Sequence, residues 1–198
     1  IPRFYDATDG SVLVDGVDVK EYKQELLNNK IGYVPQKAVM FTGSVMENVT
    51  FGSTDKEITS KNVEEAIRVA QAEGFVREME DGINSHIARG GTNVSGGQKQ
   101  RLSIARAIAR DPEIYIFDDT FSALDYKTDS ILRSELKKHT KNATNIIVAQ
   151  RIGTIMNADK IIVLDKGECV GIGTHDYLMK NCSIYKEIAL SQLSEEEL

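Results

Sequence analysis

The chain has 198 residues, a formal net charge of −6 and 41% hydrophobic residues, enough for one or two domains with a sizeable core. The acidic balance leaves no basic footprint for nucleic acid, and no apolar run approaches the roughly 18–20 residues that a membrane helix needs. Two cysteines are too few for a disulfide scaffold, so we expect both to be free thiols in a reducing, cytosolic setting.

Strand patterns dominate the first part of the chain. A predicted strand over 10–16 closes in Asp15-Gly16, which is a strong hairpin signal into the residues that follow. A second strand is predicted over 31–34, and Pro35 closes it. Gln36 comes next and places a polar amide just beyond the end of this strand.

Helical periodicity begins near Ser60. An apolar face at helical spacing predicts a first helix that ends at Gly74, and a second helix is predicted over 75–80. The charged residues on the other side of the first helix are expected to be a solvated surface.

A further helix begins after Ser95. This serine is a good N-cap, and Gln98 three residues later completes a capping box. Apolar residues continue at helical spacing to a stop at 111–112. Gly96 and Gly97 leave the first backbone N–H groups uncovered, so the helix start can bind an anion such as phosphate. The same four residues are equally compatible with a helix that is merely well capped.

A short apolar run over 114–117 ends in Asp118 and Asp119, which is typical of a buried parallel strand with carboxylates at its carboxyl end. Ligand chemistry in open α/β sheets collects at that end. The remaining predicted elements are a helix over 128–139, strands over 145–149, 160–164 and 168–172, and helices after Thr174 and over 184–193.

Five segments in order resemble the motifs of the nucleotide-binding domain of ABC transporters. They are the Q-loop at Gln36, the signature motif over 93–101, the Walker B motif at 118–119, the D-loop over 122–125 and the switch position at Gln150. The resemblance implies an α/β fold: a RecA-like P-loop NTPase core with an antiparallel β portion and an α-helical subdomain. The stretch 41–52 is similar to the exporter branch of the family.

The resemblance also implies three parts. Residues 1–52 would be the remainder of the β and RecA-like core with the Q-loop, 53–111 the α-helical subdomain with the signature motif, and 112–198 the RecA-like core with the later motifs. The Walker A pattern G-x-x-x-x-G-K-[ST] does not occur in the 198 residues. We therefore expect a piece that starts after the P-loop and is inactive by itself.

The family's cofactors are ATP and Mg²⁺, and the resemblance assigns roles to matching residues. Asp118 would reach Mg²⁺ through water, and Gln36 would ligand the ion and touch the attacking water. Ser95, Gly96, Gly97 and Gln98 would complete the ATP site of a second nucleotide-binding domain, with Asp125 of the D-loop also at the nucleotide.

Two positions depart from the pattern of hydrolysing members. Asp119 stands where the family has a glutamate as general base, and Gln150 where it has a histidine at the γ-phosphate. Together they resemble the degenerate half of a heterodimeric bacterial ABC exporter of the multidrug type. Arg89 also stands where exporters often have glutamate. The chain's own histidines, at positions 86, 139 and 175, are expected to be structural.

This resemblance implies a different subunit as partner, a transmembrane domain in the same parent chain, and a place at the cytoplasmic face of the plasma membrane. Two alternatives stay open: a soluble ABC ATPase, and a structural remnant that binds no nucleotide. The transported substrate is not encoded in this stretch, so drug, lipid and peptide efflux are equally compatible with it.

Overall fold

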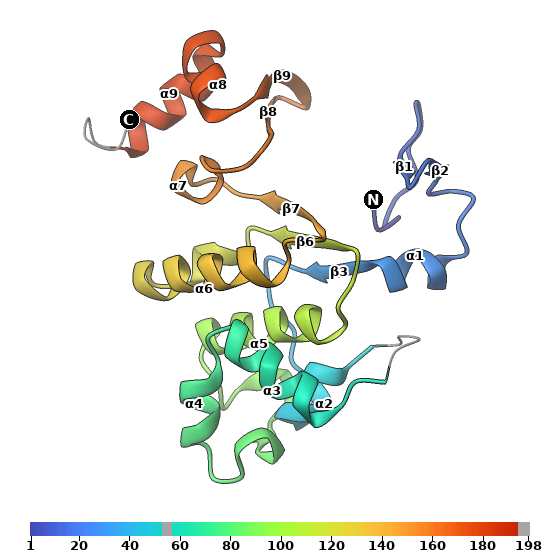
Figure 1. Ribbon diagram of the computed structural model, residues 1–198, viewed down its shortest axis with the longest axis vertical. Coiled ribbons are helices and arrows are strands. Elements are labelled where there is room, and N and C mark those ends of the chain that lie inside the picture. The colour runs from blue at the N-terminus through green and yellow to red at the C-terminus, as the bar shows by residue number, and fades with distance from the viewer. Residues whose placement is uncertain (53–56, 194–198) are drawn as a thin grey trace. The chain divides into compact units, whose positions relative to one another are not determined.

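The computed structural model describes residues 1–52 and 57–193. The chain forms two compact units, Ile1–Ile146 and Ile147–Leu198, and each contains a buried apolar cluster. The first unit is mixed α/β, and the second is a β-hairpin packed against helices (Figure 1). Within the described ranges, no helix combines the length and the apolar character that a bilayer crossing requires.

A three-stranded sheet has the order β3 (Ile31–Val34), β6 (Ile114–Asp118), β7 (Thr144–Val148). β3 and β6 pair in parallel, with Val34 opposite Phe117, and both of these side chains are buried. Since parallel strands share a direction, the carboxyl ends of β3 and β6 lie at the same edge of the sheet.

The other elements of the first unit are short antiparallel pairs and helices. The pairs are β1 (Leu13–Val14) with β2 (Val17–Asp18), and β4 (Gly43–Ser44) with β5 (His86–Ile87). The α-helices are α1 (Gln24–Lys30), α2 (Val45–Thr50), α3 (Ser60–Val69), α4 (Glu73–Glu78), α5 (Gly96–Ala109) and α6 (Tyr126–His139). The 3₁₀ turns are η1 (Gly82–Asn84), η2 (Arg89–Gly91) and η3 (Thr120–Ala123).

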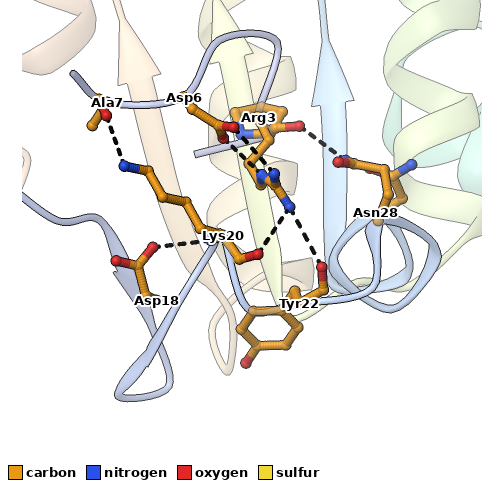
Figure 2. A network of polar contacts seen from close by, with 9 residues as sticks. Arg3, Asp6, Ala7, Asp18, Lys20, Tyr22 and Asn28 are labelled. Atoms are coloured by element: carbon orange, nitrogen blue, oxygen red, sulfur yellow. Dashed lines mark hydrogen bonds and ion pairs between the residues drawn. The ribbon is translucent and has the colours of Figure 1, made fainter.

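The β1–β2 hairpin turns at Asp15 and Gly16, as the sequence predicts. Their φ angles are 50° and 78°, so both central residues take the left-handed conformation that a tight hairpin turn requires. Arg3 fastens the start of the chain beside this hairpin: its guanidinium pairs with Asp6 at 2.9 Å and donates to the carbonyl of Tyr22 at 3.4 Å (Figure 2).

The helix starts follow local side-chain chemistry. The predicted capping box of α5 is confirmed: Ser95 N–H donates to Gln98 Oε1 at 2.8 Å, and Gln98 N–H donates to Ser95 Oγ at 3.3 Å. α6 begins at Tyr126, two residues before the predicted start, because Asp125 caps it and accepts from Thr128 N–H at 2.9 Å.

The predicted end of α3 at Gly74 is wrong. The helix ends at Val69, because Gln71 adopts a left-handed backbone with φ of 57° and interrupts the helical path. α4 then begins at Glu73, two residues before the predicted start.

The second unit pairs β8 (Ile161–Asp165) with antiparallel β9 (Glu168–Gly173) and adds α7 (Ile152–Ile155), α8 (His175–Asn181) and α9 (Ser183–Gln192). One face of β8 is buried through Ile161 and Val163, in a cluster with Leu178 of α8 and Tyr185 of α9. His175 is structural, as predicted: its Nδ1 lies 2.8 Å from the buried Tyr185 hydroxyl.

Arg106 of α5 joins three parts of the first unit. Its Nε donates to the carbonyl of Asn48 in α2 at 2.7 Å, and both terminal nitrogens lie 3.2 Å from the carbonyl of Val39, which follows β3. Burial lowers the pKa of Arg106 to about 10, so the guanidinium remains charged at neutral pH and donates strong hydrogen bonds.

We expect Arg106→Ala to lower the free energy of unfolding by about 2–4 kcal/mol, because it removes the donor to the part-buried Asn48 carbonyl and the bonds to the Val39 carbonyl. Arg77→Ala is the matched control: Arg77 pairs with Glu73 on the exposed surface of α4, so its loss should cost less than about 1 kcal/mol. Urea denaturation followed by circular dichroism measures both, and equal effects would show that the Arg106 contacts are not stabilising.

Candidate functional site

Polar side chains gather where β3 and β6 end. Asp118 is the last residue of β6, Asp119 follows it, and Gln36 comes two residues after β3. Gln36 Nε2 donates to Asp119 Oδ2 at 2.9 Å, and the Tyr33 hydroxyl donates to Asp118 Oδ2 at 3.0 Å. The pairing of the two strands thus places three of the candidate residues at one edge of the sheet.

Asp119 has an unusual backbone. Its φ and ψ are 42° and 32°, in the left-handed region, and η3 starts at the next residue. Aspartate enters this region more readily than most residues, because its short polar side chain makes local hydrogen bonds. The buried Thr120 hydroxyl donates to the Val34 carbonyl at 3.2 Å and so fastens the turn to the end of β3.

The donor atoms at this edge fit Mg²⁺. The ion prefers oxygen ligands, and proteins usually supply one or two carboxylates while phosphates and waters complete the octahedron. Tyr33 engages Asp118 Oδ2, and no group within the described chain bonds to Oδ1, so this oxygen can face the ion or one of its waters. Gln36 uses its amide nitrogen toward Asp119, which leaves its Oε1 as a second oxygen donor.

Tyr33 is the residue of this site that the sequence did not indicate. It lies opposite Ile116 in the β3–β6 register, and Asp118 is two residues further along the same face. Burial, followed by the hydrogen bond to Asp118, raises the pKa of the Tyr33 hydroxyl, so this group remains a donor at neutral pH. The only sequence signal was strand alternation, which cannot pair two strands without their register.

The start of α5 is open to an approaching group. The amides of Gly96 and Gly97 are the first two of the helix and have no intrahelical acceptor. A Cβ at Gly96 would meet no atom within 4 Å, whereas one at Gly97 would lie 3.6 Å from the Ala123 carbonyl. The Ser95 hydroxyl accepts from Gln98 N–H and keeps its own proton for donation.

Asp125 follows η3 and serves as the N-cap of α6. Hydrogen bonds from Thr128 lower the pKa of its carboxyl, and the positive charge of Arg101 on α5 adds to this effect. Arg101 is itself fixed, since its Nη1 donates to the Gln71 carbonyl at 2.6 Å. The carboxylate therefore stays ionised well below neutral pH.

Gln150 belongs to the second unit, whereas the other candidate residues belong to the first. Its backbone carbonyl accepts from Gln192 Nε2 of α9 at 2.9 Å, and Gln192 Oε1 accepts from the Ile152 N–H at 2.9 Å. The residue is exposed. α9 thus fixes the backbone at Gln150 without engaging the side-chain amide.

A family model and individual relatives both relate this chain to ABC transporters. The sequence model of the family described as ABC transporter matches residues 1–122. An uncharacterised ABC transporter ATP-binding protein of Mycobacterium tuberculosis is 49% identical over 193 residues, which cover 97% of this chain and 33% of the relative. The ATP-dependent lipid A-core flippase of Francisella tularensis is 39% identical over 193 residues, covering 98% and 32%.

A solved structure of a bacterial Atm1-family ABC exporter with ATP bound superposes with a TM-score of 0.92 and 32% sequence identity. The match covers 98% of this chain and 34% of the exporter. The chain therefore spans about a third of the length of the relatives it matches.

The left-handed backbone at Asp119 predicts how this position tolerates substitution. Asp119→Asn should keep the free energy of unfolding within about 0.5 kcal/mol, since asparagine also accepts positive φ. Asp119→Val should lower it by about 1–3 kcal/mol, because a β-branched side chain is strained there. Urea denaturation of the two variants checks this, and equal stability would contradict the left-handed assignment.

Proposed function

This chain belongs to the ABC transporter family, and we propose that it is the ATP-binding domain of an exporter whose own catalytic site is degenerate. The observation that carries the proposal is the contact at the end of β6: the base position holds the short carboxylate of Asp119, and the Gln36 amide is bound to it at 2.9 Å. In this role the chain couples ATP binding at the cytoplasmic membrane face to export of a substrate.

Asp118 and Gln36 would hold Mg²⁺ through the oxygens that face away from Tyr33 and Asp119. When bound, the ion neutralises charge on the nucleotide's phosphates during phosphoryl transfer. The chain's own contribution is to fix those two oxygens on adjacent strand ends, so that little reorganisation is needed when the nucleotide arrives.

Hydrolysis at this chain's own site should be slow. Asp119 is one methylene shorter than glutamate, and a misplacement of about 1 Å costs on the order of 10²-fold in rate. Loss of general-base help costs about 10²–10⁴-fold. Gln150 can donate a hydrogen bond but cannot carry a proton as an imidazole does. Both changes weaken the same step, which is activation of water at the γ-phosphate.

Helix α5, which begins within the signature motif and is called the signature helix below, is proposed to act at the ATP site of the partner subunit. The open amides of Gly96 and Gly97 and the Ser95 hydroxyl are suited to an oxyanion, and Gln98 braces them through the capping box. In the proposed arrangement they bind the γ-phosphate of ATP held by a second, different nucleotide-binding subunit, and Asp125 lies at the same interface. We propose that this site, formed by both subunits, is the one that hydrolyses ATP efficiently.

The proposed organisation of the chain follows from these roles. The segment 53–111 would be the helical subdomain, since α3, α4 and α5 follow one another within it, and 1–52 and 112–198 would form the core. The boundary at 52/53 lies next to residues 53–56, outside the described part of the chain. The transmembrane region is proposed to belong to the same polypeptide.

The asymmetry can be tested in the full-length transporter reconstituted with its partner. Asp119→Asn should change ATP turnover less than about twofold, whereas glutamine in place of the partner's catalytic glutamate should reduce it by about 10²-fold or more. Asparagine is the chosen variant because it keeps the left-handed turn. If Asp119→Asn abolishes turnover as well, Asp119 is a working base and the degenerate assignment is wrong.

The role of the signature helix predicts a second effect on turnover. Ser95→Ala should lower it by about 10²-fold, because a phosphate donor at the competent site is lost. Thr59→Ala is the matched control: Thr59 caps α3 through the same kind of capping box, with Asn62 as its partner. Both variants should lose similar stability, about 1 kcal/mol, but only Ser95→Ala should slow turnover. Equal ATP turnover in the Ser95→Ala and Thr59→Ala variants would refute the proposed role of Ser95 as a phosphate donor.

A further inference from the structure

Tyr33 and Asp118 make a side-chain contact between two adjacent strands at the proposed metal edge. Tyr33 pairs with Ile116 in the parallel register, and Asp118 lies two residues further toward the carboxyl end, on the same face. The phenol extends along the strand direction and its hydroxyl lies 3.0 Å from Asp118 Oδ2.

Packing holds the Tyr33 ring independently of this hydrogen bond. The side chain lies against the apolar cluster that contains Leu27, Ile31 and Ile116. The Phe4 ring contacts it edge-on, with the centroids 5.4 Å apart and the planes at 74°. The hydroxyl is therefore presented from a fixed ring, and the carboxylate is the more adjustable partner.

An aspartate at a strand end has a broad χ2 torsion, so its two oxygens can exchange positions unless something holds one of them. The hydroxyl bond to Oδ2 restricts rotation of the carboxylate and leaves Oδ1 available to a ligand. Hydrogen bonds of this kind to a metal ligand typically change metal affinity or activity by 10–100-fold.

We propose that Tyr33 is a positioning residue for Asp118: its hydroxyl holds Oδ2 and so aims Oδ1 at the metal of this chain's nucleotide site. The inference rests on the proposed function, in which Asp118 anchors Mg²⁺. Asp119 is held by a different donor, Gln36, so removal of the Tyr33 hydroxyl leaves the Gln36–Asp119 contact intact.

The chain contains a matched control for the Tyr33 hydroxyl. Tyr22 packs against the same apolar cluster, and its hydroxyl donates to the Val14 carbonyl at 3.1 Å, away from Asp118. Tyr33→Phe and Tyr22→Phe therefore remove the same group and a bond of similar length, but only Tyr33→Phe takes a donor from Asp118.

The experiment uses the full-length transporter with its partner, carrying glutamine at the partner's catalytic glutamate so that ATP persists. Mn²⁺ replaces Mg²⁺, and its binding is titrated by electron paramagnetic resonance with ATP present. Asp118→Asn should remove the Mn²⁺ bound at this chain's site. Tyr33→Phe should raise the Kd of that Mn²⁺ by about 10-fold, and Tyr22→Phe should leave it unchanged.

The Asp118→Asn and Tyr33→Phe results test the anchoring role of Asp118 and the positioning role of Tyr33 separately. If Asp118→Asn leaves Mn²⁺ binding unchanged, the proposed anchoring role of Asp118 fails and the inference fails with it. If Asp118→Asn removes the ion but Tyr33→Phe binds it like Tyr22→Phe, the anchoring role stands and the Tyr33 inference is overturned. A Tyr33→Phe protein that melts well below Tyr22→Phe also overturns it, because the hydroxyl would then support the fold.

Discussion

The parallel register of β3 on β6 is the constraint on which the rest of the first unit depends. It sets Val34 against Phe117 in the core and brings two strand ends to one edge, although the segments are far apart in the chain. Gln36, Asp118 and Asp119 meet there only because of that alignment. A slip of one residue would turn Tyr33 to the other face and separate it from Asp118.

The same strand end is also tied to the helix that presents the signature motif. Gln100, buried in α5, donates through Nε2 to the Pro35 carbonyl at 3.1 Å, and Arg106 of the same helix holds the Val39 carbonyl. Gln36 therefore lies in the short segment 35–39, whose first and last carbonyls both accept hydrogen bonds from α5. In the proposed assembly, the start of α5 binds the phosphate of the partner's ATP. The rest of the helix contacts the segment that contains Gln36, which belongs to this chain's own ATP site.

Features set by neighbours in sequence could be predicted, and contacts between distant segments could not. The Ser95–Gln98 capping box and the Asp15–Gly16 turn depend on residues at most three positions apart, and both were confirmed. The Tyr33–Asp118 and Gln36–Asp119 bonds join residues 85 and 83 positions apart. Their formation requires the strand register, which no local pattern specifies. Helix ends were misplaced where one residue turned left-handed, as at Gln71.

The backbone at Asp119 has an evolutionary consequence under the proposed function. Glycine, asparagine and aspartate take left-handed angles at little cost, so drift among them leaves the turn before η3 undisturbed. A β-branched residue is disfavoured at these angles, so changes at the base position are channelled toward side chains that keep the turn and its contact with Gln36.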